Sequence, residues 1–125
     1  MGNYNEGFQQ KYNKEFTKDD LNDKSKFDLK EFHDNMRVFK GGSDAFDIID
    51  KSVQVVSNND NATLKIHDLR SVTITNNGRK FDFTSSYTYP LTKYCVKIDD
   101  QKQYCSCDVS ILDLTMDITK LESKL

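Results

Sequence analysis

Residues 72–83 read VTITNNGRKFDF and contain the strongest hairpin signal of the chain. Asn77-Gly78 is the dipeptide that two-residue hairpin turns prefer, because both turn residues need a positive φ. With this turn, apolar side chains face one another across the two strands in the pairs Ile74–Phe81 and Val72–Phe83. The other face is polar and carries Thr73, Thr75, Lys80 and Asp82. The stretch predicts an antiparallel sheet with one buried and one open face.

A second hairpin is predicted upstream, because apolar residues alternate with polar ones from Val53 onward. The turn-rich residues 58–61 separate two such segments. A loop there places Val55 opposite Leu64 and Val53 opposite Ile66, all on one face. Residues 43–50 just before it favour either a short helical stretch or a direct lead into this strand.

A third hairpin is predicted over residues 93–110, with its loop at 99–102. This loop pairs Ile98 with Gln103 and therefore Val96 with Cys105. Tyr94 then faces Cys107, so both of these cysteines belong to the apolar face.

The three cysteines, Cys95, Cys105 and Cys107, all lie in this hairpin. The predicted register makes Cys105 and Cys107 buried thiols, which pack like small hydrophobic side chains. It leaves Cys95 as the most reactive thiol, on the face that carries lysines, and melting should then be insensitive to reductant. The second interpretation is a disulfide from Cys95, which requires a different register. The third is a zinc or copper site, although the spacing lacks paired C-x-x-C motifs.

A helix is predicted over residues 26–40. Ser25 and Asp28 have the spacing of a capping box, and Gly41-Gly42 supplies a stop. Its buried stripe is predicted to consist of Leu29, Phe32, Met36 and Phe39. Before it, residues 1–24 form a polar lead that could contain a short helix, with Phe8, Tyr12 and Phe16 at steps of four.

The fold class predicted from these elements is α+β: the 26–40 helix packs on an antiparallel meander of about six strands, which could curl toward a half barrel. Residues 25–125 form a single domain. The tail, residues 110–125, has both strand and helix periodicity, and a long bulged strand is favoured over a helix.

Charge and composition exclude several classes of function. The chain has 125 residues with 18 Lys and Arg against 20 Asp and Glu, so it lacks the basic surface of a nucleic-acid binder. No apolar run approaches the ~20 residues of a membrane span, so no membrane insertion is expected. No signal peptide opens the chain, which leaves a cytoplasmic location by default and the mature part of an exported protein as the alternative. Phosphate-loop, G-x-S-x-G and H-E-x-x-H motifs are missing, so an enzyme is the less favoured class, and no cofactor is expected.

Residues 83–94, FTSSYTYPLTKY, have the composition of a contact surface. Tyr87, Tyr89 and Tyr94 stand among Ser and Thr, and tyrosine offers a large contact area with a polar tip at low entropy cost. The favoured hypothesis is a small non-catalytic module that binds another protein, as an inhibitor, an immunity-type protein or an assembly subunit. The alternative is a small-molecule-binding protein or enzyme that uses the concave face of the sheet, with His33 or His67 at the pocket wall.

Overall fold

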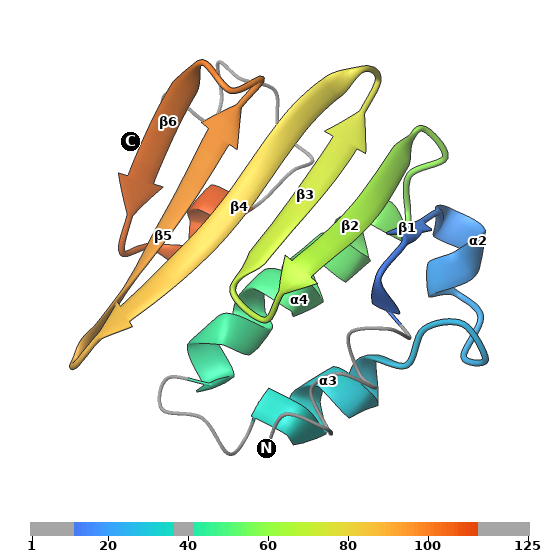
Figure 1. The fold of residues 1–125 in the computed structure, drawn as a ribbon, viewed down its shortest axis with the longest axis horizontal. Helices are drawn as coiled ribbons and strands as arrows, with labels where there is room; N and C mark the ends of the chain where they lie inside the picture. The colour runs from blue at the N-terminus through green and yellow to red at the C-terminus, as the bar shows by residue number, and fades with distance from the viewer. Residues whose placement is uncertain (1–11, 37–41, 113–125) are drawn as a thin grey trace.

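The structure, a computed structural model, describes residues 12–36 and 42–112 of the chain (Figure 1). They form one antiparallel sheet with the strand order β1-β2-β3-β4-β5-β6, and the helices cover one of its faces. The elements are β1 (Glu15–Phe16), α2 (Lys18–Leu21), α3 (Leu29–Met36), α4 (Gly42–Val56), β2 (Ala62–Asp68), β3 (Ser71–Asn76), β4 (Arg79–Thr88), β5 (Leu91–Ile98), β6 (Lys102–Ser106) and the 3-10 helix η1 (Val109–Leu112). The predicted α+β class and the meander are confirmed. Among the described residues, β1 and β6 are the two edge strands, and the sheet does not close into a barrel.

The β3–β4 hairpin has the predicted register, with Ile74 opposite Phe81 and Val72 opposite Phe83. Asn77 and Gly78 form its turn with φ values of 54° and 80°. The central prediction from residues 72–83 is therefore confirmed. All four paired side chains are buried, and the facing row of polar residues lies on the open side of the sheet.

Replacing Gly78 by Val should lower the free energy of unfolding by about 1 kcal/mol or more. The space around Gly78 is open, so the loss comes from the positive φ, which a β-branched residue adopts only with strain. Gly78→Asn is the matched control, because asparagine tolerates this conformation far better. Denaturant unfolding of the two variants measures the difference. Equal stability of both variants and the unmodified protein would contradict the turn.

The predicted strand at Val53 is wrong, because these residues belong to the helix α4. Over so short a segment, alternating apolar residues also fit one face of a helix. The buried positions of α4 recur at steps of three and four, as a helical stripe requires: Ala45, Ile48, Ile49, Ser52, Val53 and Val56. Leu64 consequently pairs with Ile74 of β3, and the other edge of β2 is occupied by β1, which pairs Phe16 with Leu64.

The first predicted helix is present and begins three residues later than predicted. α3 begins at Leu29, and the carboxylate of Asp28, not the Ser25 side chain, accepts the backbone N–H of Lys30 at 3.0 Å. Ser25 instead bonds to Asp23 at 2.7 Å. Residues 37–41, with Phe39 and Gly41 of the predicted stripe and stop, lie outside the described residues.

Part of the polar lead belongs to the core. Tyr12 and Phe16 are buried and form an aromatic cluster with Phe27 and Phe32. The Tyr12 hydroxyl donates to Glu31 of α3 at 2.9 Å. Phe16 lies in a strand, not on the predicted helical face, and Phe8 lies outside the described residues.

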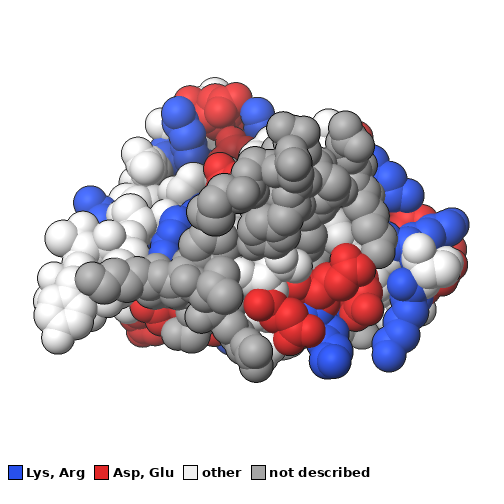
Figure 2. Space-filling view, turned by 60° about the horizontal axis from the view of Figure 1, so that its bottom comes forward, with Lys and Arg blue, Asp and Glu red and all other residues white. Residues whose placement is uncertain are grey.

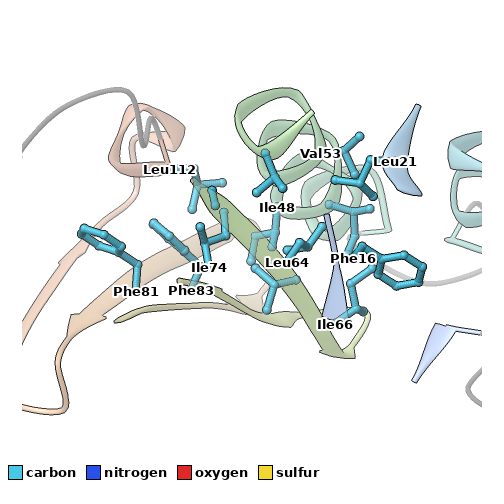
Figure 3. Close-up of a cluster of buried hydrophobic side chains, with 14 of the residues drawn as sticks. Phe16, Leu21, Ile48, Val53, Leu64, Ile66, Ile74, Phe81, Phe83 and Leu112 are labelled. Carbon is cyan, nitrogen blue, oxygen red and sulfur yellow. The ribbon is translucent and has the colours of Figure 1, made fainter. Parts of the chain in front are cut away.

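The core lies between α4 and the apolar face of the sheet. Figure 3 shows Ile48 and Val53 of α4 above the strand residues Leu64 and Ile74. Leu112 reaches the same cluster from η1, so the core includes both the N-terminal and the C-terminal described segments. The described residues therefore form a single domain.

The predicted register of the third hairpin is wrong by one residue. Ile98 pairs with Lys102, and Cys95 pairs with Cys105. The reason is a tighter turn: Asp99 and Asp100 adopt φ values of 52° and 59°, and the Asp99 carboxylate accepts the Lys80 backbone N–H at 2.8 Å. The shift by one residue moves each side chain of β6 to the opposite face of the sheet, whereas the side chains of β5 keep their predicted faces. Tyr104, and not a cysteine, therefore packs against the core opposite Val96.

The interpretation of the cysteines as core thiols is therefore corrected. Cys95 and Cys105 form a disulfide on the open face, with their Cα atoms 4.1 Å apart. Cys107 is a free thiol and is exposed. The second interpretation, a bond from Cys95, describes the structure.

The beginning of the tail is a 3-10 helix, η1, and not the strand favoured from its sequence. Ile111 and Leu112 are buried, which anchors this turn in the core. Residues 113–125 lie outside the described residues.

Candidate binding site at the tip of the β4–β5 hairpin

The β4–β5 hairpin is longer than the strands on either side of it. β3 begins at Ser71, opposite Thr84, and β6 ends at Ser106, opposite Tyr94. Beyond these points three cross-strand pairs have no further strand beside them within the part of the chain that the structure describes: Ser86–Lys93, Tyr87–Thr92 and Thr88–Leu91. Figure 1 shows this end of the hairpin projecting past the turn between β2 and β3.

The tip of the hairpin is apolar and exposed. Tyr89 is 77% exposed and Leu91 is 61% exposed, and these are the large hydrophobic side chains that remain exposed among the described residues. Tyr87 is half-buried, and Thr88 and Pro90 are exposed. Apart from the Cys95–Cys105 disulfide, the open sheet face beside the hairpin carries polar side chains such as Thr84, Lys93 and Lys97.

The base of the projecting segment is anchored to α4 by two hydrogen bonds. The hydroxyl of Thr92 donates to the carboxylate of Asp44, and the hydroxyl of Tyr94 donates to that of Asp47 at 3.3 Å. Asp44 and Asp47 are one helical turn apart and therefore lie on the same face of α4. The hairpin is thus held from the helix side at alternate residues of β5.

A second anchor comes from the turn between β2 and β3. The backbone carbonyl of Arg70 accepts the N–H of Ser85 at 3.0 Å, and its guanidinium donates to the Ser85 hydroxyl at 3.2 Å. Together with the bonds from α4, this contact holds the hairpin base in place, so the tip is presented on a supported scaffold.

Burial determines the electrostatics at the hairpin base. Desolvation raises the pKa of Asp47, although the hydrogen bond from Tyr94 opposes the change. Desolvation also raises the pKa of the Tyr94 phenol, and the nearby Asp47 and Asp44 add to this effect. The neutral phenol is therefore the form that donates to Asp47 over the whole neutral range of pH.

Because the pKa of Asp47 is higher in the folded chain, the native state binds more protons than the unfolded state in the pH range between the ordinary value of 3.8 and the folded pKa. The contribution of Asp47 to stability is therefore fully present at lower pH and is lost as pH rises through the folded pKa. Asp47→Asn keeps an oxygen acceptor for Tyr94 but has no titrating group. Its stability relative to that of the unmodified protein should therefore increase as the pH is raised from 3.5 to 7. Denaturant unfolding of both proteins across this range measures the change. A stability difference that is constant with pH would contradict the burial argument.

The structure separates the three predicted contact tyrosines. Tyr89 is at the exposed tip, and Tyr87 is half-buried two residues before it. Tyr94 is only 4% exposed, so it belongs to the core, and its hydroxyl donates to Asp47. Sequence reasoning missed Leu91, although it stands in the quoted segment, and missed Asp44 and Asp47. The i, i+3 spacing of these two aspartates would have indicated a shared helix face only once residues 42–56 had been assigned to a helix.

The two histidines lie at separate places. His33 is in α3, with its side chain 54% exposed and its ring in a T-shaped contact with that of Phe46. His67 is on the open sheet face, where its Nε2 lies 2.7 Å from the Thr73 hydroxyl, which in turn donates to Asp82 at 2.5 Å. Since that hydroxyl has a single proton, Nε2 must carry the hydrogen of the His67–Thr73 bond.

The apolar face of the sheet is covered by α4, so neither histidine lines a concave apolar surface there. Within residues 12–36 and 42–112, no group of three or more His, Cys, Asp or Glu side chains is arranged to hold a metal ion. Over the same part of the chain, no helix has both the length and the apolar character needed to cross a membrane. Figure 2 shows acidic and basic side chains in small groups of both signs.

Comparisons with known proteins gave no match: no protein-family model, no curated protein and no solved structure matches the chain.

Proposed function

We propose that the protein is a small non-catalytic module that binds another protein through the tip of its β4–β5 hairpin. The observation that carries the proposal is the pair of exposed apolar side chains, Tyr89 and Leu91, at the end of a projecting hairpin with an anchored base. An inhibitor, an immunity-type protein and an assembly subunit would all use such a surface.

Exposed apolar side chains that stand together support contact with a protein partner. Tyrosine is enriched among the residues that dominate binding energy at protein interfaces, and burial of an aromatic anchor in a pocket of the partner is the usual arrangement. The polar surroundings of the tip, with Ser86, Thr88 and Lys93, match the polar rim of such interfaces.

Anchoring of the hairpin base supports the same proposal through preorganisation. A loop that is already fixed loses less conformational entropy on binding than a free one. The bonds from Asp44, Asp47 and Arg70 hold the residues just below the tip and leave Tyr89 and Leu91 exposed. The tip is also convex, so the complementary partner surface is a cleft.

The proposal is tested by quantitative capture from a lysate of the native host. Three immobilised proteins are compared: the unmodified chain, Tyr89→Ser/Leu91→Ser, and the control Lys97→Ala on the open sheet face. Loss of a central aromatic anchor costs about 2 kcal/mol or more, which is roughly 30-fold in affinity. A partner protein should therefore bind the unmodified chain and Lys97→Ala and be at least tenfold depleted on the double variant.

All three proteins should have similar melting temperatures, because the changed side chains are exposed and such substitutions usually alter stability by less than about 0.5 kcal/mol. A specifically captured protein that binds the double variant as well as the unmodified chain would refute the hairpin tip as the contact site. Absence of any specifically captured protein would refute the function itself.

A further inference from the structure

The three cysteines lie close together in sequence at one edge of the sheet, and the bonded pair is on its open face. Cys95 is in β5 and bonded to Cys105 in the edge strand β6, one residue before that strand ends. Cys107 follows two residues later as an exposed free thiol. Were β6 one residue longer, Cys107 would lie opposite Lys93, diagonally across from Cys95.

The spacing of two residues between Cys105 and Cys107 has a consequence for the register of β6. A slip by one residue would move every side chain of β6 to the wrong face, but a slip by two keeps each side chain on its face. In the slipped register Cys107 lies opposite Cys95, Cys105 lies opposite Lys97, and Tyr104 still faces the core, now opposite Ile98. The turn then has five residues, 99–103, a length that hairpins accept.

We propose that β6 has this second register, closed by a Cys95–Cys107 disulfide that forms by internal thiol–disulfide exchange. The thiolate of Cys107 attacks Sγ of Cys95, the Cys95–Cys105 bond breaks, and Cys105 leaves as a thiolate. One S–S bond replaces another, and the proton lost by the Cys107 thiol is returned from solvent to Cys105. The step needs no oxidant or reductant.

The surroundings of the three sulfurs support this direction of exchange. Cys105 is exposed, so water hydrates its departing thiolate. In the new register it lies opposite Lys97, whose ammonium group attracts the negative charge. Lys93 carries a second ammonium group on the same face, beside the position of the attacking Cys107.

The second register is linked to the C-terminal part of the core. A slip by two residues requires about 7 Å of additional chain between β6 and the buried Ile111 and Leu112. Unwinding η1 supplies about 5 Å, because four residues rise by about 2.0 Å each in a 3-10 helix and about 3.3 Å when extended. The remaining ~2 Å must come from displacement of Ile111 and Leu112 themselves. The exchange therefore loosens η1 and its buried side chains, so the Cys95–Cys107 form is the less stable isomer.

Three single variants test the proposal after oxidation in air at pH 8.5. Cys105→Ser should form a monomer with a Cys95–Cys107 disulfide, and its nuclear Overhauser contacts should place Tyr104 opposite Ile98. Cys107→Ser is the matched control and should keep the observed Cys95–Cys105 bond and the observed register. Its melting temperature should be higher than that of Cys105→Ser. Cys95→Ser should have no bond between strands. The proposal would be overturned if Cys105→Ser folds but keeps both of its thiols free under conditions in which Cys107→Ser forms its disulfide.

A label-swap experiment on the unmodified protein keeps the proposal testable if Cys105→Ser fails to fold. Free thiols are alkylated before and after one day at pH 8.5, and the alkylated residue is located by fragmentation mass spectrometry. Alkylation should be confined to Cys107 at first and should appear in a minor fraction on Cys105 afterwards. Alkylation that stays on Cys107 alone would overturn the proposal.

Discussion

Truncation of Phe32 to alanine should lower the free energy of unfolding by about 3–5 kcal/mol, the largest loss expected from any substitution considered in this protein. The Phe32 side chain is fully buried, with its ring centroid 4.5 Å from that of Tyr12 and 5.1 Å from that of Phe27. Removing the ring leaves a cavity at the point where α3 meets the N-terminal segment. Because domains of this size are stable by only ~5–15 kcal/mol, the variant should melt far below the unmodified protein.

Phe32→Leu is the matched control, because it keeps most of the apolar volume and loses only the aromatic contacts. Its loss should be clearly smaller than that of the alanine variant. Denaturant unfolding followed by circular dichroism measures both. If Phe32→Ala unfolds at the same denaturant concentration as the unmodified protein, the assignment of Phe32 to the core is wrong.

Removal of the disulfide should have the second largest effect. Cys95→Ser opens a loop whose ends are 10 residues apart in sequence, and the chain-entropy relation gives a loss of about 2–3 kcal/mol. For a domain of this size the melting temperature should fall by roughly 10 °C. The edge strand β6 should be destabilised first, since β5 is the strand to which the disulfide ties it.

Reductant separates this effect from a packing defect. It should lower the melting temperature of the unmodified protein and of Cys107→Ser, and leave that of Cys95→Ser unchanged. A melting temperature of the unmodified protein that does not respond to full reduction would contradict a stabilising disulfide.

The parts of the fold that follow from local chemistry could be predicted from the sequence. Asn77-Gly78 determines its own turn through two positive φ values, and the turn then determines the pairs across β3 and β4. α3 was found from its apolar spacing, but its start was misplaced because Asp28 and Ser25 can each cap a helix. Local patterns decide such elements with little help from the rest of the chain.

Elements that depend on distant partners could not be predicted in this way. Val53 and Val55 alternate as in a strand, and only the packing of the whole stripe from Ala45 to Val56 on the sheet makes them helical. In the third hairpin, the register depends on Asp99, whose carboxylate binds Lys80 and Arg79 of β4. That contact joins residues about 20 positions apart, and it determines which face carries Cys105.

The candidate site shows the same division. The composition of residues 83–94 indicated a contact surface, and Tyr89 is exposed as that hypothesis requires. Its projection beyond the sheet depends on where β3 and β6 end, which no local pattern reveals. Tyr94 was included with the other tyrosines because nothing in the segment itself shows the half-buried carboxylate of Asp47 that accepts its hydrogen bond.

Site-specific photo-crosslinking tests most directly the claim that the hairpin tip is the contact site. A photoreactive phenylalanine analogue replaces Tyr89 in one protein and Gln103, on the exposed open face of the sheet, in a second. Both are irradiated in native host lysate, and the crosslinked products are identified by mass spectrometry. Our account predicts one dominant crosslinked protein from position 89 and none in common from position 103. The same partner crosslinked from position 103 and not from position 89 would contradict it.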